Sequence, residues 1–377
     1  MRRNLLLFLF LIFIVVFVSL LTFIPRVSVT RYFEGKKLPL DVVGQYAYLK
    51  TFLIEPLDDF TGYRSLPQRQ WKFQLAFFFY ATACMIYWDP GFDPEAPEVL
   101  ERLLLKYQQK PVWEDWVKDG YGTDPLEKNN MMYRGHLSLM LNLYQAVTGD
   151  SSYAGQARRV TLRLYREGLT HPFFGVLCEP DNYYIACNAV AQLSYRIYDK
   201  LHGTRLSQVR FPWLKWIREH LRDPETGLLA TVYHPSSGKL EWNHPARHNG
   251  WDLLFLSAVQ PGFADTLYRA YRRRLVRSFA GFAWAVRSPG GLWPDPAGTG
   301  FALGASRAEK DSVRFAMFLR SLKRFAKPQW QNRRLRYWRS NLLGNTILLF
   351  AKVASFQELF RADFPLLRSR RTASVGQ

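Results

Sequence analysis

Cysteine is scarce in this sequence, with three in 377 residues. Cys84, Cys178 and Cys187 are too few for a disulfide framework, and none stands in a C-x-x-C pair of the kind that binds zinc. This scarcity excludes a small disulfide-stapled domain. Cys84 lies in an apolar run and is expected to fill the core. Cys178 and Cys187 either pair in an oxidising compartment or remain thiols that line a pocket.

Acidic residues are also few, with 31 Asp and Glu against 51 Lys and Arg and a formal net charge of +20. The basic excess gathers at residues 271–277, at 333–339 and near the C-terminal end. Such runs usually form a solvated face, and the alternative is attraction to anionic lipid headgroups. A nucleic-acid partner is not expected, because the sequence contains no recognisable binding module.

Alternating strand patterns are nearly absent as well. Apolar periodicity instead predicts helices, and their joints place Gly after one helix and Asp, Ser or Thr before the next. The predicted helices span residues 40–54, 68–88, 95–109, 127–148, 152–169, 182–201, 206–221, 248–259, 263–285, 308–325 and 341–361. Because the pairs recur about every fifty residues, we predict an all-α fold, an (α/α)6 toroid of paired antiparallel helices.

Two segments depart from the helical pattern. Residues 227–242 alternate around a Ser-Ser-Gly turn, which predicts a small hairpin near the mouth of the toroid. Tyr233 lies in this hairpin and is a predicted substrate contact. Residues 286–307 are rich in Gly and Pro and are predicted to be irregular, as a rim loop or a disordered insertion.

The first residues form an apolar segment. Residues 4–24 carry no charge and would span ~31 Å as a helix, which matches the ~30 Å hydrocarbon core of a bilayer. Because residues 19–26 offer a poor small-residue cleavage site, we predict a membrane anchor or uncleaved signal at 1–28. A catalytic domain at 29–362 and a disordered basic tail at 363–377 complete the expected organisation. Basic residues flank the segment on both sides, so charge does not orient it.

A polar, aromatic run lies at residues 113–125. Trp113 and Tyr121 stand there among three aspartates, a mixture too polar for a core and too aromatic for an ordinary loop. We interpret the run as a pocket wall and both aromatic residues as substrate contacts. Met132 and His136 follow four residues apart on a predicted helix and therefore share one face. That face can hold a proton donor beside an apolar contact, although a lone His there is also commonly a core residue.

A third motif, CEPDNYYIACN, spans residues 178–188. It contains Cys178 and Cys187 and the predicted start of a helix near Tyr183, capped by the Asp or Asn before it. Tyr183 and Cys187 are four residues apart and are predicted to face one cavity. Two thiols, a histidine and several carboxylates from three neighbouring segments are therefore expected to converge.

These motifs give the sequence a family resemblance. The matching segments are TDPLEK at 123–128, MYRGH at 132–136, LYQAVTG at 143–149, CEPDNYYIACN at 178–188 and YDKLHGT at 198–204. On these residues the chain resembles the linalool dehydratase/isomerase family over about residues 67–260. The resemblance implies a homo-oligomer of toroids. Because members of the family carry export signals, it also implies a body in the periplasm, held to the inner membrane by the N-terminal segment.

The activity that the resemblance implies is lyase and isomerase chemistry on a hydrophobic, terpene-like alcohol. A tertiary allylic alcohol loses its hydroxyl, or moves it to a primary position, by acid/base catalysis in a dry aromatic bore and without a cofactor. By position, Cys178 and Cys187 would be acid/base or hydroxyl-positioning groups and His136 a hydrogen-bond partner of the hydroxyl. Met132 would be an apolar contact. Leu53 stands where the family has an aspartate that is donated across a subunit boundary.

Two alternatives remain from the residues themselves. Toroids of this class often process sugars with paired carboxylates, and the chain offers candidates for such a pair. They are Asp115, Asp119, Asp124, Glu241 and Asp252. The other alternative is a non-catalytic envelope protein that keeps the toroid for binding.

Overall fold

The computed structural model describes residues 8, 10–12, 14, 27–54, 56–243 and 245–367. Most of the predicted anchor at 1–28 and of the predicted tail at 363–377 lies outside these residues. Among the described residues, no helix combines the length and the apolar character that crossing a membrane requires.

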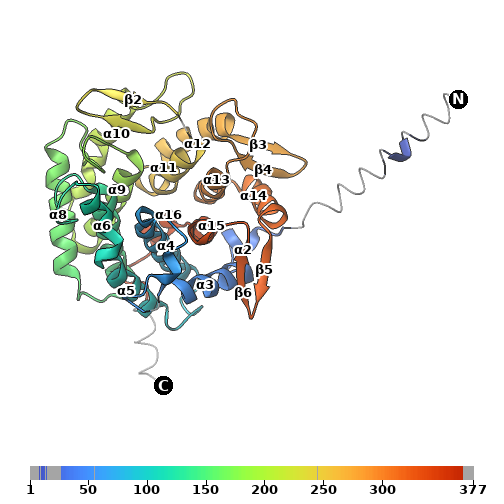
Figure 1. Ribbon diagram of the computed structural model, residues 1–377, viewed down its shortest axis with the longest axis horizontal. Coiled ribbons are helices and arrows are strands. Elements are labelled where there is room, and N and C mark those ends of the chain that lie inside the picture. The colour runs from blue at the N-terminus through green and yellow to red at the C-terminus, as the bar shows by residue number, and fades with distance from the viewer. Residues whose placement is uncertain are drawn as a thin grey trace.

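Six helices form a closed inner ring within the described part of the chain (Figure 1). Each packs against the next in chain order, and the last packs back against the first. The ring consists of α4 (Trp71–Trp88), α7 (Met131–Thr148), α9 (Ile185–His202), α11 (Ala246–Val259), α13 (Pro296–Ala308) and α15 (Leu342–Val353).

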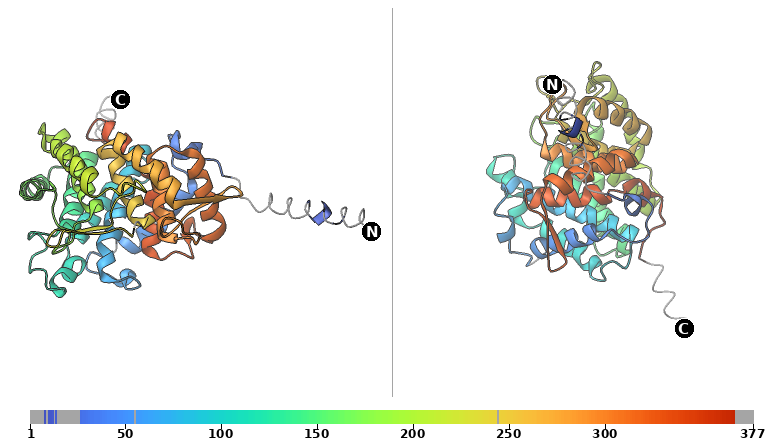
Figure 2. Two further views of the ribbon diagram at one scale, coloured as in Figure 1. Left: turned by 90° about the horizontal axis from the view of Figure 1, so that it is seen from above. Right: turned by 90° about the vertical axis from the view of Figure 1, so that its right-hand side faces the viewer.

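A second layer of helices surrounds the ring, and each position in this layer packs mainly on one inner helix. In the order of their inner partners from α4 to α15, these are α5 (Ala96–Tyr107), α8 (Ala154–Leu169), η3 (Leu206–Val209) with α10 (Arg210–His220), α12 (Pro261–Leu275), α14 (Ser312–Phe325) and α3 (Leu40–Leu53). Both layers run through the thickness of the ring (Figure 2). This arrangement confirms the predicted (α/α)6 toroid.

The two layers differ in the way their sequences bury apolar surface. Helix α4 is apolar on all sides and is buried almost throughout, as expected for the wall of a filled ring. Its Phe77 stacks on Phe350 at 5.7 Å, and Tyr80 meets Phe255 at 5.9 Å and Phe356 at 5.6 Å. Aromatic side chains therefore pack into this part of the ring's interior.

Glycine ends two inner helices, as the joint pattern predicts. Gly149 follows α7 with φ 76° and Gly203 follows α9 with φ 68°, a left-handed conformation that disfavours residues with a Cβ. The chain can thus turn back at once, and α8 and η3 start within a few residues. These caps explain why short connections join the inner and outer layers.

Three two-stranded hairpins interrupt the helices in the described part of the chain. The first, β1 (Val232–His234) and β2 (Lys239–Glu241), confirms the predicted hairpin. The others are β3 (Val276–Phe279) with β4 (Phe282–Ala285), and β5 (Pro328–Gln331) with β6 (Arg334–Tyr337).

Two sequence predictions in the second half of the chain were wrong. The predicted helix at 263–285 ends at Leu275, because Ala280 and Gly281 adopt positive φ and form the turn of the β3–β4 hairpin. The predicted irregular segment at 286–307 contains α13, an inner helix. Its glycines allow close approach, since a Cβ at Gly304 would meet the backbone of Ala351 at 3.2 Å.

The remaining elements are short. They are α2 (Thr30–Phe33), η1 (Thr61–Tyr63), η2 (Gln68–Gln70), α6 (Lys110–Lys118) and α16 (Phe356–Arg361). Helix α6 carries Trp113, so the run interpreted as a pocket wall begins as a helix. Helix α9 begins at Ile185, later than predicted, which leaves Tyr183 in the extended segment before it.

Candidate functional site at the mouth of the toroid

A small hollow opens where four inner helices begin. Its volume is about 50 Å³. Its lining comes from the first turns of α4, α7, α9 and α11 and from the segment before β1: Phe73, Met132, Tyr184, Ile185, Ala186, Cys187, Ala230, Thr231, His248, Trp251 and Asp252. The mouth therefore lies at the N-terminal ends of these inner helices.

Asp252 is the acidic group of this hollow. Its side chain is buried on α11, and burial raises its pKa well above the usual range of an aspartate. Burial therefore favours the protonated form of this carboxyl group, which can donate a proton. The Thr231 hydroxyl also lines the hollow, and its Oγ1 is buried without a hydrogen-bond partner among the described residues. Together the two side chains give the apolar hollow a polar point of contact.

Tyr184 and His248 form one side of the hollow, with ring centroids 6.4 Å apart. Burial lowers the pKa of His248 to about 4, assisted by the Arg247 charge and opposed by Asp295 and Glu241. His248 is therefore uncharged at neutral pH. Burial also raises the pKa of Tyr184, and acidic groups including Glu241 add to that effect. Glu241 thus acts electrostatically on two side chains that line the hollow.

The segment 178–184 fastens the β1–β2 hairpin beside the mouth. Tyr183 and Tyr233 exchange backbone hydrogen bonds of 2.9 and 3.1 Å. The Asp181 carboxylate accepts a bond of 2.7 Å from the Ser236 N–H in the hairpin turn. The Tyr183 ring is buried, and its Oη accepts a 2.6 Å hydrogen bond from Trp213 Nε1. Tyr183 therefore supports the mouth from behind, while Tyr233 stands half-buried in the hairpin.

Cys178 and Cys187 are both buried free thiols. Cys187 lines the hollow, and the Cys178 thiol donates to the Tyr184 carbonyl at 3.7 Å. Burial raises the pKa of Cys178 far above its ordinary value, and its hydrogen bond with Cys187 acts in the same direction. The Cys178 thiol is therefore protonated.

His136 lies behind an aromatic layer of the hollow. Its ring packs against Phe73 at 5.8 Å and Trp251 at 6.0 Å, both of which line the hollow. Its Nδ1 is 2.8 Å from Tyr80 Oη, whereas its Nε2 is buried with no partner among the described residues. Burial and the nearby charge of Lys72 lower the pKa of His136 to about 3. The imidazole is neutral.

Two of the predicted substrate contacts lie elsewhere. Trp113 borders a separate hollow of about 260 Å³, and its Nε1 donates to the Gln108 carbonyl at 3.2 Å. Tyr121 packs on Trp116 with ring centroids 5.2 Å apart. Neither residue is part of the lining of the mouth hollow.

The aspartates of the same run hold the fold together. Asp115 pairs with the buried Lys72 at 2.7 Å, and Asp119 pairs with Arg69 at 2.9 Å. Asp124 accepts a 2.8 Å bond from the Leu126 N–H.

Several residues of the mouth were not predicted, among them Thr231, His248 and Trp251. The available signal was the RHNGWD run at residues 247–252, which places polar groups and a tryptophan in the first turns of an otherwise apolar helix. Among the described residues, no cluster of three or more His, Cys, Asp or Glu side chains is placed to hold a metal ion.

Solved structures show the same fold at low sequence identity. One is the α-1,6-mannanase GH76A of Salegentibacter sp. HEL1_6, solved as an inactive double Asp→Asn variant in complex with α-1,6-mannotriose. It is 12% identical to this chain with a TM-score of 0.57, and the match covers 85% of this chain and 99% of the mannanase. A GH76 α-mannanase of Bacteroides thetaiotaomicron is 12% identical with a TM-score of 0.58, covering 84% and 96%. A family 105 glycoside hydrolase of C. acetobutylicum is 14% identical with a TM-score of 0.57, covering 82% and 99%.

The predicted activity on a terpene-like alcohol was wrong. The three solved structures named above, which share this fold over most of both chains, are by their names enzymes that act on glycans. The mouth hollow of about 50 Å³ is also far below the ~300 Å³ at which pockets for small ligands begin. Leu53, at the position of the family's aspartate, is buried in the core. The names of these similar structures favour the carbohydrate alternative over the terpene one.

The resemblance of the sequence to the linalool dehydratase/isomerase family is confirmed. A family model described as linalool dehydratase/isomerase matches residues 72–164 and 155–343, which together include almost all of α4, the whole of α7, α9, α11 and α13, and the start of α15. The chain belongs to the linalool dehydratase/isomerase family of enzymes.

Proposed function

We propose that this protein is a carbohydrate-active enzyme that hydrolyses a glycosidic bond at the mouth of the toroid. The observation that carries the proposal is the buried carboxyl group of Asp252 in the lining of the mouth hollow, where burial raises its pKa. A general acid for glycoside hydrolysis must hold its proton at neutral pH, and burial supplies that property. The shared fold with glycan-acting enzymes supports the same class of substrate.

Glu241 is the candidate partner carboxylate. It ends β2, its side chain is 36% exposed, and its Oε1 lies 3.1 Å from His234 Nε2. Because its charge acts on Tyr184 and His248, it lies close to the hollow that holds Asp252. Burial favours a proton on Asp252, whereas Glu241 is partly exposed to solvent. Two carboxyl groups in such different environments can divide the roles of general acid and general base.

In the proposed hydrolysis Asp252 is the general acid and Glu241 the general base. The Asp252 proton passes to the glycosidic oxygen as the bond from that oxygen to the anomeric carbon breaks. A water oxygen bonds to the anomeric carbon, and the water proton passes to Glu241. Solvent returns the proton from Glu241 to Asp252, so the enzyme is regenerated.

Aromatic side chains beside the mouth offer surfaces for sugar rings. Trp242, which follows β2, is 41% exposed, and the partly exposed Trp251 stacks on Phe301 at 5.6 Å. Since the hollow admits only a small group, the sugar chain would lie across the mouth with one oxygen directed at Asp252. Tyr233 of the hairpin would contact the same chain.

The test is a reducing-end assay of the purified full-length chain against neutral and acidic polysaccharides, with three variants. Asp252→Asn is expected to lower kcat by ~10²–10⁴-fold, since it removes the general acid. Glu241→Gln is expected to lower kcat by a similar factor. Asp265→Asn, which removes an exposed carboxylate on α12, should match the parent. Circular dichroism confirms that each variant is folded, and hydrolysis that survives in Asp252→Asn would refute the assignment.

A further inference from the structure

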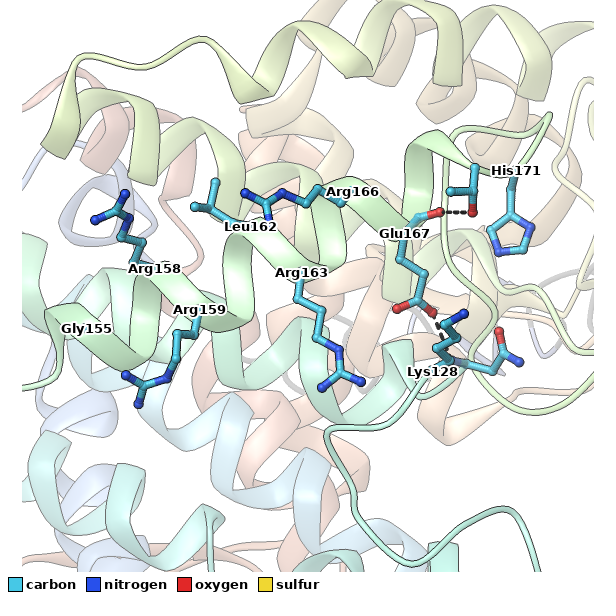
Figure 3. A pocket seen from close by; sticks show the side chains of 11 residues that line it. Lys128, Gly155, Arg158, Arg159, Leu162, Arg163, Arg166, Glu167 and His171 are labelled. Atoms are coloured by element: carbon cyan, nitrogen blue, oxygen red, sulfur yellow. Dashed lines mark hydrogen bonds between the residues drawn. The ribbon is translucent and has the colours of Figure 1, made fainter.

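A larger hollow lies on the outer face of the ring, along helix α8 (Figure 3). Its volume is about 950 Å³. Besides α8, it is bordered by Lys128 and Asn129, which precede α7, and by Thr170 and His171, which follow α8. We call this hollow the α8 groove.

Four arginines dominate the lining of the α8 groove: Arg158, Arg159, Arg163 and Arg166. Helix α8 buries the opposite stripe, which includes Ala157, Val160 and Leu164, against α7. All four arginines are exposed, and Figure 3 shows them spread along the helix, with Arg158 and Arg166 directed to one side of it and Arg159 and Arg163 to the other. The amphipathic sequence of α8 therefore presents a row of cations to solvent.

Glu167, the acidic residue in the lining, does not neutralise this row. Its carboxylate pairs with the buried Arg134 at 2.7 Å and accepts a 3.0 Å bond from the Asn129 N–H. Among the described residues, none of the four arginines forms an ion pair. The ion pair on α8 is the one between Glu167 and Arg134. The α8 groove thus has an uncompensated positive charge.

The spacing of the charges selects an extended ligand. Arg158 and Arg166 are eight residues apart, which is ~12 Å along a helix. One phosphate or one carboxylate cannot contact groups spread over that length. A chain that carries an anionic group at each repeat can contact several of them at once and gains affinity from every counterion released.

The α8 groove ends beside the mouth of the toroid. His171 stacks on Phe173 with centroids 4.8 Å apart, and Phe173 contacts Tyr183 at 4.7 Å and Tyr233 at 6.2 Å. Tyr233 belongs to the hairpin beside the mouth. The His171 end of the α8 groove is therefore close to the hairpin beside the mouth, and a polymer lying in the groove would point towards it.

We propose that the α8 groove binds an acidic polysaccharide, a glycan with repeated carboxylate, sulfate or phosphate groups, and directs it to the mouth. That the polymer is a glycan rests on the proposed function, whereas the binding of a polyanion rests on the arginines alone. Single-stranded nucleic acid fits less well, because no Phe, Tyr or Trp lines the groove for base stacking. A bilayer also fits less well. The apolar N-terminal run leads into α2, whose Phe33 packs on Phe315 of α14, across the ring from α8 (Figure 1).

The test is equilibrium binding of the full-length chain to fluorescent polygalacturonate and dextran sulfate, with neutral dextran as the uncharged probe. Arg159→Ala/Arg163→Ala is expected to weaken binding of both anionic probes at least tenfold. It should also reduce the slope of log K against log salt by about 2, one for each charge removed. The matched control, Arg102→Ala/Arg269→Ala, removes two arginines that pair with Glu98 and Asp265 on other outer helices, and it should bind like the parent.

The outcomes separate the two proposals. Binding by Asp252→Asn that depends on Arg159 and Arg163, with no hydrolysis by the parent, supports the groove and refutes the proposed function. Hydrolysis of an acidic glycan with a KM that Arg159→Ala/Arg163→Ala leaves unchanged supports the proposed function and overturns the groove. Equal affinity for neutral dextran, or tighter binding to duplex DNA or to phosphatidylglycerol vesicles than to either anionic glycan, also overturns the groove.

Discussion

The mouth hollow and the α8 groove differ in the solvent exposure of their ionisable groups. In and behind the mouth, burial keeps Asp252, His136, His248 and Cys178 in their uncharged forms. On α8, by contrast, four guanidinium groups are exposed to solvent. The difference shows how one fold separates two tasks. Proton transfer needs a neutral acid in a dry place, whereas capture of a polyanion needs permanent charge in an open one.

The largest expected loss of stability comes from breaking the buried ion pair between Arg134 and Glu167, which lies beneath the α8 groove. Arg134 is 1% exposed and supports the α8 groove from below through its ion pair with Glu167, whose side chain is 8% exposed. Arg134→Ala leaves that carboxylate buried and unpaired, which typically costs ~3–5 kcal/mol. Urea denaturation should therefore show a much lower midpoint for Arg134→Ala. A midpoint like that of the parent would mean that Glu167 finds water instead of a buried partner.

The second effect is a pH dependence set by His136. Its folded pKa of about 3 lies below the ordinary value of 6.5, so the unfolded chain binds the proton first as pH falls. The associated stability is complete above about pH 6.5 and is lost as pH falls towards 3, by at most ~1.4 kcal/mol per pH unit. His136→Gln should flatten that part of the stability curve measured by urea unfolding between pH 3 and 7. An unchanged slope in the variant would assign the loss to other groups.

Asp252 is expected to make the stability of the fold depend on pH in the direction opposite to that of His136, with a smaller effect. Because its folded pKa is raised, the folded chain holds the proton more tightly, and the stability that this supplies declines as pH rises above about 4. Asp252→Asn removes the decline, so the melting temperature of the variant should exceed that of the parent by a growing margin from pH 5 to 8. A margin that does not grow with pH would show that the parent carboxyl is ionised in this range.

The sequence predicted the ring because the ring depends on local signals. Periodic apolar residues and helix-ending glycines such as Gly149 and Gly203 act within one turn, so eleven of the twelve helical positions in the two described layers could be placed from them. The errors occurred where long-range packing decides. Residues 296–308 contain glycines that an isolated helix would disfavour, and they form α13 because close contact with α15 requires small residues there.

The candidate site was harder to predict because burial determines its chemistry. Asp252 was one of five carboxylates that the sequence could not rank, and only the fold shows that Asp115 is paired with Lys72 while Asp252 is buried at the mouth. The α8 arginines were similarly present in the sequence without a stated role. Their common face follows from the helix, but their position beside the mouth follows from the loop through His171 and Phe173.

The smallest expected effect tests whether the α8 groove exists for binding or for the fold. Arg159 and Arg163 are four residues apart on α8, where like charges destabilise a helix by ~0.2–0.5 kcal/mol. Arg163→Ala should therefore raise the free energy of unfolding slightly at low salt, and the gain should fade above ~0.2 M salt as the repulsion is screened. Exposed arginines that lower stability are readily explained by a ligand that uses them. If Arg163→Ala instead destabilises the protein by more than ~1 kcal/mol, this guanidinium has a structural role and the row of charges is part of the fold.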